Sequence, residues 1–119
     1  MLKRKIGDMG EELACKYLKK KKYKIIDRNF QTRYGEIDII ALKKDVICFV
    51  EVKTRNNDDF QKAYESVTSK KMERIKTTAF QYLQKNHGDK QLRFDIIEVY
   101  TNRENKNKIE INHYENAFI

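Results

Sequence analysis

The spacing of hydrophobic positions changes several times along the chain and predicts two amphipathic helices. Helical spacing runs over Ile6–Lys20 and resumes after residue 68, with one apolar stripe in each segment. The first stripe consists of Leu13, Ala14, Tyr17 and Leu18, and the second of Met72, Ile75, Ala79, Tyr82 and Leu83. Thr68 or Ser69 is an N-cap candidate for the second helix, and Gly88 is a plausible stop signal.

Shorter apolar runs with alternating or continuous hydrophobicity predict five strands. They cover Tyr23–Phe30, Gly35–Leu42, Val46–Lys53, Gln91–Tyr100 and Ile109–Tyr114. The order helix, three strands, helix, two strands predicts an α/β fold with one sheet and helices packed against it. The second helix then serves as a crossover that makes part of the sheet parallel. With 119 residues and no repeat or linker, we expect a single domain over 1–119.

The segment between the third strand and the second helix is weakly periodic. Asn56–Asp59 reads as a loop, and Phe60–Val67 is compatible with a short helical turn. A second polar loop is expected over Thr101–Lys108.

Three charged residues interrupt the apolar strands: Asp38 in the second, and Glu51 and Lys53 in the third. Side chains alternate between the two faces of a strand. Glu51 and Lys53 therefore lie on one face with Ile47 and Phe49, while Val46, Cys48, Val50 and Val52 point the other way. In the second strand, Glu36, Asp38, Ile40 and Leu42 are expected to share a face.

The turn between these strands decides whether the charged residues meet. A two-residue loop, Lys44-Asp45, pairs Lys43 with Val46 and sets Asp38 opposite Glu51, and a four-residue loop gives the same register. A three-residue loop instead pairs Asp38 with Val50. We favour the first register, because it places the two carboxylates opposite each other and so gives one common reason for both to occur in apolar strands.

Opposed carboxylates repel, at a cost of roughly 0.2–1 kcal/mol in a solvated sheet, and a divalent cation turns that cost into a binding site. Mg²⁺ commonly uses one or two carboxylates together with substrate phosphate oxygens. Lys53 on the same face could position water or stabilise developing charge. The alternative is a cross-strand salt bridge at a sheet edge. A second Glu-x-Lys sequence, Glu104–Lys106, lies in a polar loop and carries no such interpretation.

The first helix could contribute a further acidic ligand. At 100° per residue, its apolar stripe leaves Glu12 on the opposite side and Glu11 at the flank, near Ala14 and Leu18. If one of the pair reaches the sheet, we expect Glu11. The alternative for both residues is favourable placement of carboxylates near a helix N-terminus.

The chain carries 26 Lys and Arg against 18 Asp and Glu, a formal charge of +8, which favours a polyanionic partner such as nucleic acid. We expect basic groups to surround these charged positions: Arg33, Arg55, Lys70, Lys71, Arg74 and the run Lys19–Lys22. Tyr34 could stack on a base or sugar, and Lys71 with Arg74 suits a phosphate contact. The alternative is a solvated lysine-rich surface.

The cysteines, histidines and longest apolar segments indicate the cellular compartment of the protein. Cys15 and Cys48 occupy apolar patterns and read as small buried hydrophobes rather than a disulfide, which suits a reducing compartment. With His87 and His113 they show no zinc spacing. No segment has the length of a membrane span, and the N-terminus has no apolar signal region. We therefore expect a cytoplasmic protein.

Several motifs taken together resemble a known family. They are GDMGEELACKYL, RNFQTRYGEIDIIA, ICFVEVKTR, SKKMERI, LRFDIIEVY and NHYENAF, and they extend from Gly7 to Phe118. They resemble the YraN-like proteins, the uncharacterised protein family UPF0102, which is similar to the archaeal Holliday junction resolvases of the PD-(D/E)XK nuclease superfamily. The resemblance implies an αβββαβ core with a mixed sheet flanked by helices. It also implies Glu11 as the helical acid, Asp38 as the first strand carboxylate, and Glu51 with Lys53 as the E-x-K pair.

The resemblance further implies a function: a Mg²⁺- or Mn²⁺-dependent endonuclease that hydrolyses DNA, with branched, flapped or junction DNA in repair or recombination as its substrate. Asp38, Glu51 and Glu11 would bind metal, and Lys53 would assist the water or the transition state. Resolvases of this type act as dimers, so a homodimer is implied. The alternative from another class is a non-catalytic nucleic-acid-binding or repair-scaffold protein. A weaker one is an RNA-associated basic domain, for which no RNA-stacking motif is present.

Overall fold

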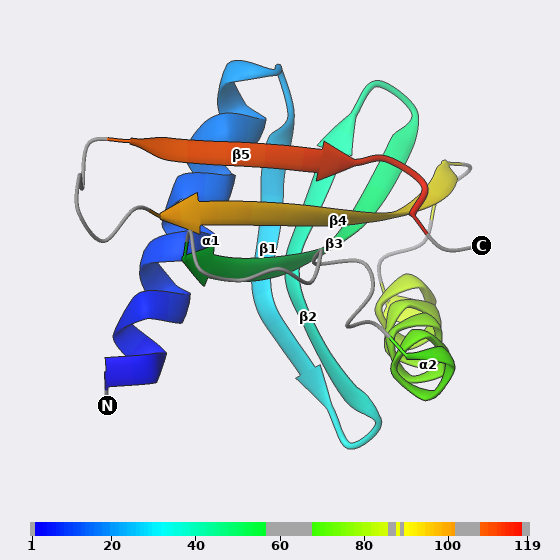
Figure 1. The fold of residues 1–119 in the computed structure, drawn as a ribbon. Helices are drawn as coiled ribbons and strands as arrows, with labels where there is room; N and C mark the ends of the chain where they lie inside the picture. Colours follow the sequence, from blue (N-terminus) through cyan, green and yellow to red (C-terminus); the bar gives the residue numbers. More distant parts are fainter. Residues whose placement is uncertain (1, 57–67, 86–87, 89, 102–107, 118–119) are drawn as a thin grey trace.

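The computed structural model describes residues 2–56, 68–85, 88, 90–101 and 108–117. It contains the elements in the predicted order (Figure 1). These are α1 (Leu2–Lys20), β1 (Lys24–Thr32), β2 (Gly35–Lys43), β3 (Val46–Asn56), α2 (Ser69–Lys85), β4 (Gln91–Thr101) and β5 (Ile109–Tyr114). The expected helical turn over Phe60–Val67 and the sequence Glu104–Lys106 lie outside the described residues.

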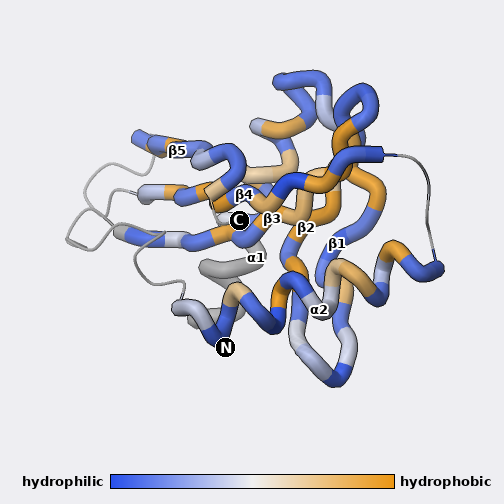
Figure 2. The backbone as a smooth tube through the Cα atoms, turned by 90° about the vertical axis from the view of Figure 1, so that its right-hand side faces the viewer, coloured by the Kyte–Doolittle hydropathy of each residue, from blue (hydrophilic) through white to orange (hydrophobic). Residues whose placement is uncertain are grey.

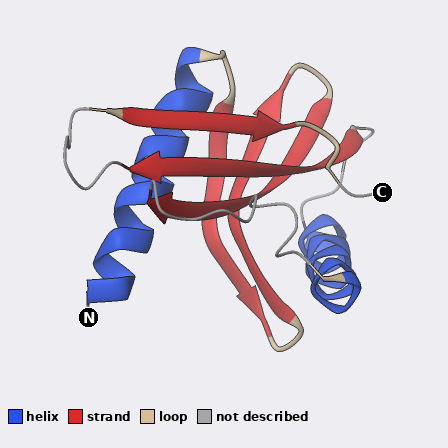
Figure 3. Cartoon of the chain, viewed as in Figure 1, coloured by secondary structure: helices blue, strands red, loops and turns tan. Residues whose placement is uncertain are grey.

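The strands form one mixed sheet in the order β1-β2-β3-β4-β5 (Figure 3). β1, β2 and β3 are antiparallel neighbours, β3 and β4 are parallel, and β5 is antiparallel to β4. The sheet is strongly twisted, so that β1 and β2 run across the direction of β4 and β5 (Figure 1). The predicted α/β fold, with a parallel pair created by the α2 crossover, is confirmed.

The register of the β2–β3 hairpin is the one we favoured. Lys43 pairs with Val46, and the ladder continues to Ile39 opposite Val50. Lys44 takes a left-handed conformation in the two-residue turn, with φ of 53°. One step beyond the last pair of this ladder stand Asp38 and Glu51.

Each helix covers one face of the sheet and has its own core. The α1 core consists of Ala14, Cys15, Leu18, Tyr23, Ile39, Ala41, Cys48, Val50, Ile97 and Val99. The α2 core consists of Ile37, Ile40, Ile47, Phe49, Ile75, Ala79, Tyr82 and Ile96. Figure 2 shows hydrophobic positions concentrated in the central strands and alternating with hydrophilic ones along α2. The predicted faces of β3 are confirmed, because Ile47 and Phe49 belong to the α2 core while Cys48 and Val50 belong to the α1 core.

Strict alternation fails at one place in β2. Ile40 lies in the α2 core as expected, but Ile37 does so too. The strand twists toward α2 near the β1–β2 hairpin, where a Cβ on Gly35 would stand 3.2 Å from Thr78 Oγ1. The hairpin therefore packs closely on α2, and Gly35 makes this approach possible.

Local sequence fixes the helix ends that matter for the site. The Thr68 hydroxyl accepts the Lys71 N–H at 3.2 Å, so Thr68 is the N-cap of α2. α1 ends with Lys22 in a left-handed conformation and with the Tyr23 N–H donating to the Leu18 carbonyl at 2.9 Å. Within α1, a Cβ on Gly10 would clash with the Thr54 hydroxyl. A glycine at this position lets α1 approach β3 directly beside Glu11.

Two smaller expectations concern the cysteines and the membrane. Cys15 and Cys48 are both free and buried, as predicted. Burial raises the pKa of the Cys48 thiol to about 12. No helix in the described part of the chain is long and apolar enough to cross a membrane.

Candidate active site

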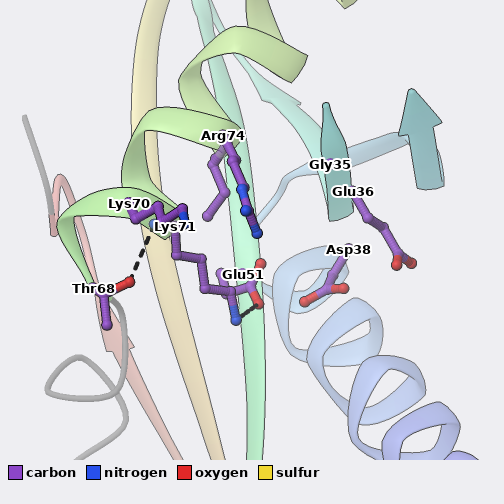
Figure 4. Close-up of a pocket in the computed structure, with 9 residues that line it drawn as sticks. Gly35, Glu36, Asp38, Glu51, Thr68, Lys70, Lys71 and Arg74 are labelled. Carbon is purple, nitrogen blue, oxygen red and sulfur yellow. Dashed lines mark hydrogen bonds and ion pairs between the residues drawn. The ribbon is translucent and has the colours of Figure 1, made fainter. Parts of the chain in front are cut away.

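Asp38 and Glu51 lie side by side where β2 and β3 leave their common ladder. The Asp38 carboxylate accepts the main-chain N–H of Val52 at 2.8 Å, so it reaches across to β3. Glu51 is 9% exposed. The two acids therefore come from neighbouring strands and point into the same space (Figure 4), as the hairpin register predicts.

These acids form the floor of a pocket of about 430 Å³ between the sheet and α2. The pocket is lined by Gly35, Glu36, Asp38, Glu51, Thr68, Lys70, Lys71, Arg74 and Ile75. Lys71 and Arg74 extend from α2 toward the acids, whereas the Glu36 side chain points away from them (Figure 4). The pocket thus has an acidic sheet side and a basic helix side.

Two ammonium groups contact the Glu51 carboxylate. Lys71 Nζ lies 3.0 Å and Lys53 Nζ 3.6 Å from Glu51 Oε1. Lys53 belongs to the same strand face as Glu51, as predicted, and Lys71 comes from the first turn of α2. The predicted E-x-K pair is therefore a contact within β3. The alternative, a cross-strand salt bridge at a sheet edge, does not describe it, because both residues belong to β3, the central strand of the sheet.

The electrostatics of Asp38 are unfavourable for its charge. Burial, and then the neighbouring Glu51, raise the pKa of Asp38 to about 8, although the Val52 N–H works in the opposite direction. Glu11 also contributes to this rise. Near neutral pH the folded protein therefore favours a proton, or another cation, at Asp38.

The two lysines differ in their proton affinity. Burial, with the neighbouring Lys71, lowers the pKa of Lys53 despite its contact with Glu51. Burial also disfavours the charged form of Lys71, but contacts with Lys53 and Glu51 outweigh it and raise the pKa of Lys71. Lys71 is thus the firmly charged member, and Lys53 is the one more easily found as a neutral amine.

The structure separates the two acids of α1. The Glu11 side chain is 14% exposed and lies 4.0 Å from Arg28. Glu12 is 53% exposed and accepts a hydrogen bond from Arg28 at 3.0 Å. Glu11 therefore faces the sheet, close enough to affect Asp38, and Glu12 faces solvent. Helical phase predicted this difference.

The donor set suits a hard divalent cation. Asp38 and Glu51 supply carboxylate oxygens, the ligands that Mg²⁺ and Mn²⁺ prefer. In the described part of the chain, no group of three or more His, Cys, Asp or Glu side chains is close enough to hold a metal ion. The residues therefore fit a two-carboxylate site, at which water and substrate would have to supply the other ligands, with Glu11 nearby.

The basic residues expected around the site separate into three groups. Lys70, Lys71 and Arg74 line the pocket. Arg33 and Tyr34 lie at the tip of the β1–β2 hairpin, in a second hollow that adjoins it. Arg55 is on the same β3 face as Lys53 but does not line either cavity.

The expectation that Lys19–Lys22 surrounds the site is wrong. This run precedes the start of β1, at the opposite end of that strand from Arg33 (Figure 1). Its lysines line neither cavity, because the chain must traverse the whole of β1 before it reaches the hairpin beside α2.

Sequence reasoning missed the role of Lys71 at Glu51 and a second acidic residue within an apolar strand. Asp95 in β4 is fully buried and accepts hydrogen bonds from Arg93 Nη2 at 2.9 Å and from the Asn116 N–H at 3.0 Å. His113 Nε2 lies 2.7 Å from the same carboxylate. The signal was present, since Asp95 interrupts LRFDIIEVY much as Asp38 interrupts its own strand.

The fold and pocket define a mixed α/β protein with a five-stranded sheet, a helix on each face, and an acidic pair opposite a basic helix end. The model of the uncharacterised protein family UPF0102 matches residues 10–99, and the chain belongs to this family. A UPF0102 protein of Alkaliphilus oremlandii is 49% identical over 120 residues, covering 98% of this chain and 100% of the relative. UPF0102 proteins of Caldanaerobacter subterraneus and Clostridioides difficile are 46% and 45% identical, covering 98% and 94% of this chain and 96% and 95% of their own lengths.

Proposed function

We propose that this protein is a metal-dependent endonuclease of the PD-(D/E)XK superfamily, similar to the archaeal Holliday junction resolvases. Its substrate would be DNA, with branched or flapped structures preferred, and its reaction the hydrolysis of a phosphodiester bond. The observation that carries the proposal is the convergence of Asp38 and Glu51 in one pocket that is walled by Lys70, Lys71 and Arg74. Lys53 does not line this pocket, but its ammonium lies 3.6 Å from the Glu51 carboxylate.

The acidic side of the pocket would hold the cation. Asp38 and Glu51 would be direct ligands, and Glu11 would act directly or through water. A bound Mg²⁺ or Mn²⁺ would polarise the phosphate and lower the pKa of an attacking water. The raised pKa of Asp38 supports this assignment, because a buried acid beside a second acid gains most from a nearby positive charge.

Lys53 would act on the reacting atoms. Its lowered pKa suits an amine that accepts a hydrogen bond from the attacking water or donates one to the phosphate oxygens. As water adds to phosphorus and the P–O bond breaks, negative charge grows on the phosphate and on the leaving oxygen. A lysine held against Glu51 at 3.6 Å is in place to offset that charge.

The helix side of the pocket would hold the DNA backbone. The first turn of α2 contains no acidic residue, so Lys70 and Lys71 add to the positive end of the helix dipole. Cations at a helix N-terminus are unfavourable unless an anion lies nearby. Glu51 is such an anion for Lys71, a phosphate group would supply another, and Arg74 extends the positive surface by one helical turn.

The direct test is incubation of the purified protein with linear, flapped and four-way-junction DNA in Mg²⁺, Mn²⁺ or EDTA. We expect cleavage of a branched substrate that EDTA abolishes. Glu51→Ala and Lys53→Ala should remain folded and lose cleavage by at least about 100-fold, in line with the loss of groups that stabilise a transition state. The matched control is Glu12→Gln, which changes an exposed acid of α1 and should cleave like the wild type.

Unchanged cleavage in either active-site variant would rule out these roles. Salt-sensitive DNA binding that is indifferent to divalent metal, without cleavage, would instead favour the non-catalytic nucleic-acid-binding protein. The basic helix side of the pocket is compatible with that second function.

A further inference from the structure

A second hollow, of about 620 Å³, surrounds the tip of the β1–β2 hairpin. It is lined by Gln31, Thr32, Arg33, Tyr34, Gly35, Glu36 and Arg74. Gly35, Glu36 and Arg74 also line the acidic pocket, so the two cavities adjoin. Its volume lies within the range of about 300–1,000 Å³ that is usual for small-molecule sites.

The Tyr34 ring is held in a defined position at this tip. The Arg33 guanidinium lies 4.9 Å from the ring centre, and its Nη2 donates to the Tyr34 hydroxyl at 2.7 Å. The Tyr34 N–H donates to Thr32 Oγ1 at 3.1 Å. Tyr34 nevertheless remains 39% exposed. An aromatic ring fixed by its neighbours and still exposed can stack on a flat ligand at low entropic cost.

The remaining lining offers groups that match a nucleotide. Gln31 Nε2 lies 3.4 Å from Glu36 Oε2, so an amide and a carboxylate stand together where a base edge could exchange hydrogen bonds with them. Arg74 supplies a cation on the side toward the acidic pocket. The close packing of Gly35 on Thr78 holds the hairpin tip at a fixed position on α2.

We propose that this hollow binds one unpaired nucleotide of the substrate, with its base stacked on Tyr34 and its phosphate near Arg74. The inference rests on the proposed function and specifies its substrate: a strand that is single-stranded beside the bond to be cut, as in a flap or fork. A base inside a duplex is already stacked on both sides and must be unstacked before it can contact Tyr34. The hollow therefore selects unpaired strands.

The test is DNA binding by the full-length protein in EDTA, so that it does not depend on cleavage. Two labelled substrates are compared: a duplex with a short single-stranded flap carrying 2-aminopurine at its first unpaired position, and the same duplex fully paired. The wild type should quench the flap fluorophore by stacking. Tyr34→Ala should lose the quenching and bind the flap about tenfold more weakly, because stacking on an aromatic side chain is worth about 1–3 kcal/mol per base. Binding of the paired duplex should not change.

Two variants make the result specific. Tyr34→Phe keeps the ring and loses only the hydroxyl that accepts from Arg33, so it should retain most of the quenching and of the flap affinity. Phe80→Ala removes a 59% exposed aromatic from α2 outside both cavities and should change nothing. Equal flap binding by Tyr34→Ala and the wild type, equal losses in Tyr34→Ala and Tyr34→Phe, or equal weakening on both substrates would each overturn the proposal. A flap made of RNA that binds as tightly and quenches equally supports the subsite and widens its ligand to unpaired RNA. A protein that stacks the flap yet never cleaves refutes the nuclease assignment alone.

Discussion

Asp38 in β2 and Asp95 in β4 are both acids set within apolar strands, and they differ in how their charge is met. Asp95 accepts hydrogen bonds from Arg93 and the Asn116 N–H and contacts His113. Burial alone would raise the pKa of Asp95, but His113, Arg93 and Asn116 outweigh it and hold that pKa below its ordinary value. Asp38 accepts the Val52 N–H and faces Glu51, and its pKa rises.

The difference shows that burial alone does not separate these two acids, whereas the balance of hydrogen bonds around each carboxylate does. Because a carboxylate only accepts, His113 Nε2 donates to Asp95, and Nδ1 of the same ring lies 3.2 Å from the Tyr17 hydroxyl. Asp95 thereby joins α1, β4 and the segment after β5. Within the described part of the chain, Asp38 accepts a hydrogen bond only from the Val52 N–H, so its negative charge is poorly compensated and a proton or a cation is favoured there.

The largest expected effect is on stability, from Asp95→Ala. Removing this carboxylate leaves the Arg93 guanidinium without its buried partner. It also leaves the donors of His113 and Asn116 without their acceptor. We expect a loss of about 3 kcal/mol in the free energy of unfolding, measured by urea titration, since breaking a buried ion pair by deleting one partner typically costs that much.

The matched control is Glu115→Ala. Glu115 lies 3.8 Å from the same guanidinium but is 60% exposed, so its removal should cost no more than about 1 kcal/mol. Similar losses in the two variants would contradict the structural role of Asp95.

Asp38→Asn is expected to change the free energy of unfolding by less than Asp95→Ala and, at high pH, to raise it. The folded-state pKa of Asp38, about 8, exceeds its ordinary value near 4. The stability that comes with the extra proton is therefore complete below pH 4 and is lost as the pH rises through 8, with a slope of at most about 1.4 kcal/mol per pH unit. Asp38→Asn keeps an acceptor for Val52 and should show a flatter profile, with higher stability than the wild type at pH 9.

Thermal unfolding from pH 3 to pH 9 measures this profile. The control is Asp45→Asn, which alters an exposed turn residue at the other end of β2 and should follow the wild type. Asp95 gives the opposite sign: its lowered pKa contributes stability that is present above its ordinary pKa and is lost as the pH falls in acid. If the pH profiles of Asp38→Asn and the wild type are parallel, the folded protein does not raise the pKa of the Asp38 carboxyl.

Much of the fold follows from local patterns in the sequence. Period-two alternation and the Lys44-Asp45 turn determine the register that brings Asp38 to Glu51, and helical phase separates Glu11 from Glu12. Contacts between distant segments do not follow from such patterns. The bond from Lys71 to Glu51 depends on how α2 lies across the sheet, and two of the partners of Asp95, His113 and Asn116, come from a distant part of the chain.

The most direct test of the account is a calorimetric titration of Mn²⁺ into the wild type, Asp38→Asn, Glu51→Gln and the control Asp45→Asn at pH 7, in buffers of different ionisation enthalpy. We expect the wild type and Asp45→Asn to bind with release of close to one proton per site, because Asp38 is protonated at this pH and a metal ligand must be ionised. Affinity should rise as the pH approaches 8, and both site variants should lose binding. Binding that Asp38→Asn and Glu51→Gln leave unchanged, or no binding by the wild type, would contradict the assignment of this acidic pair as a metal site.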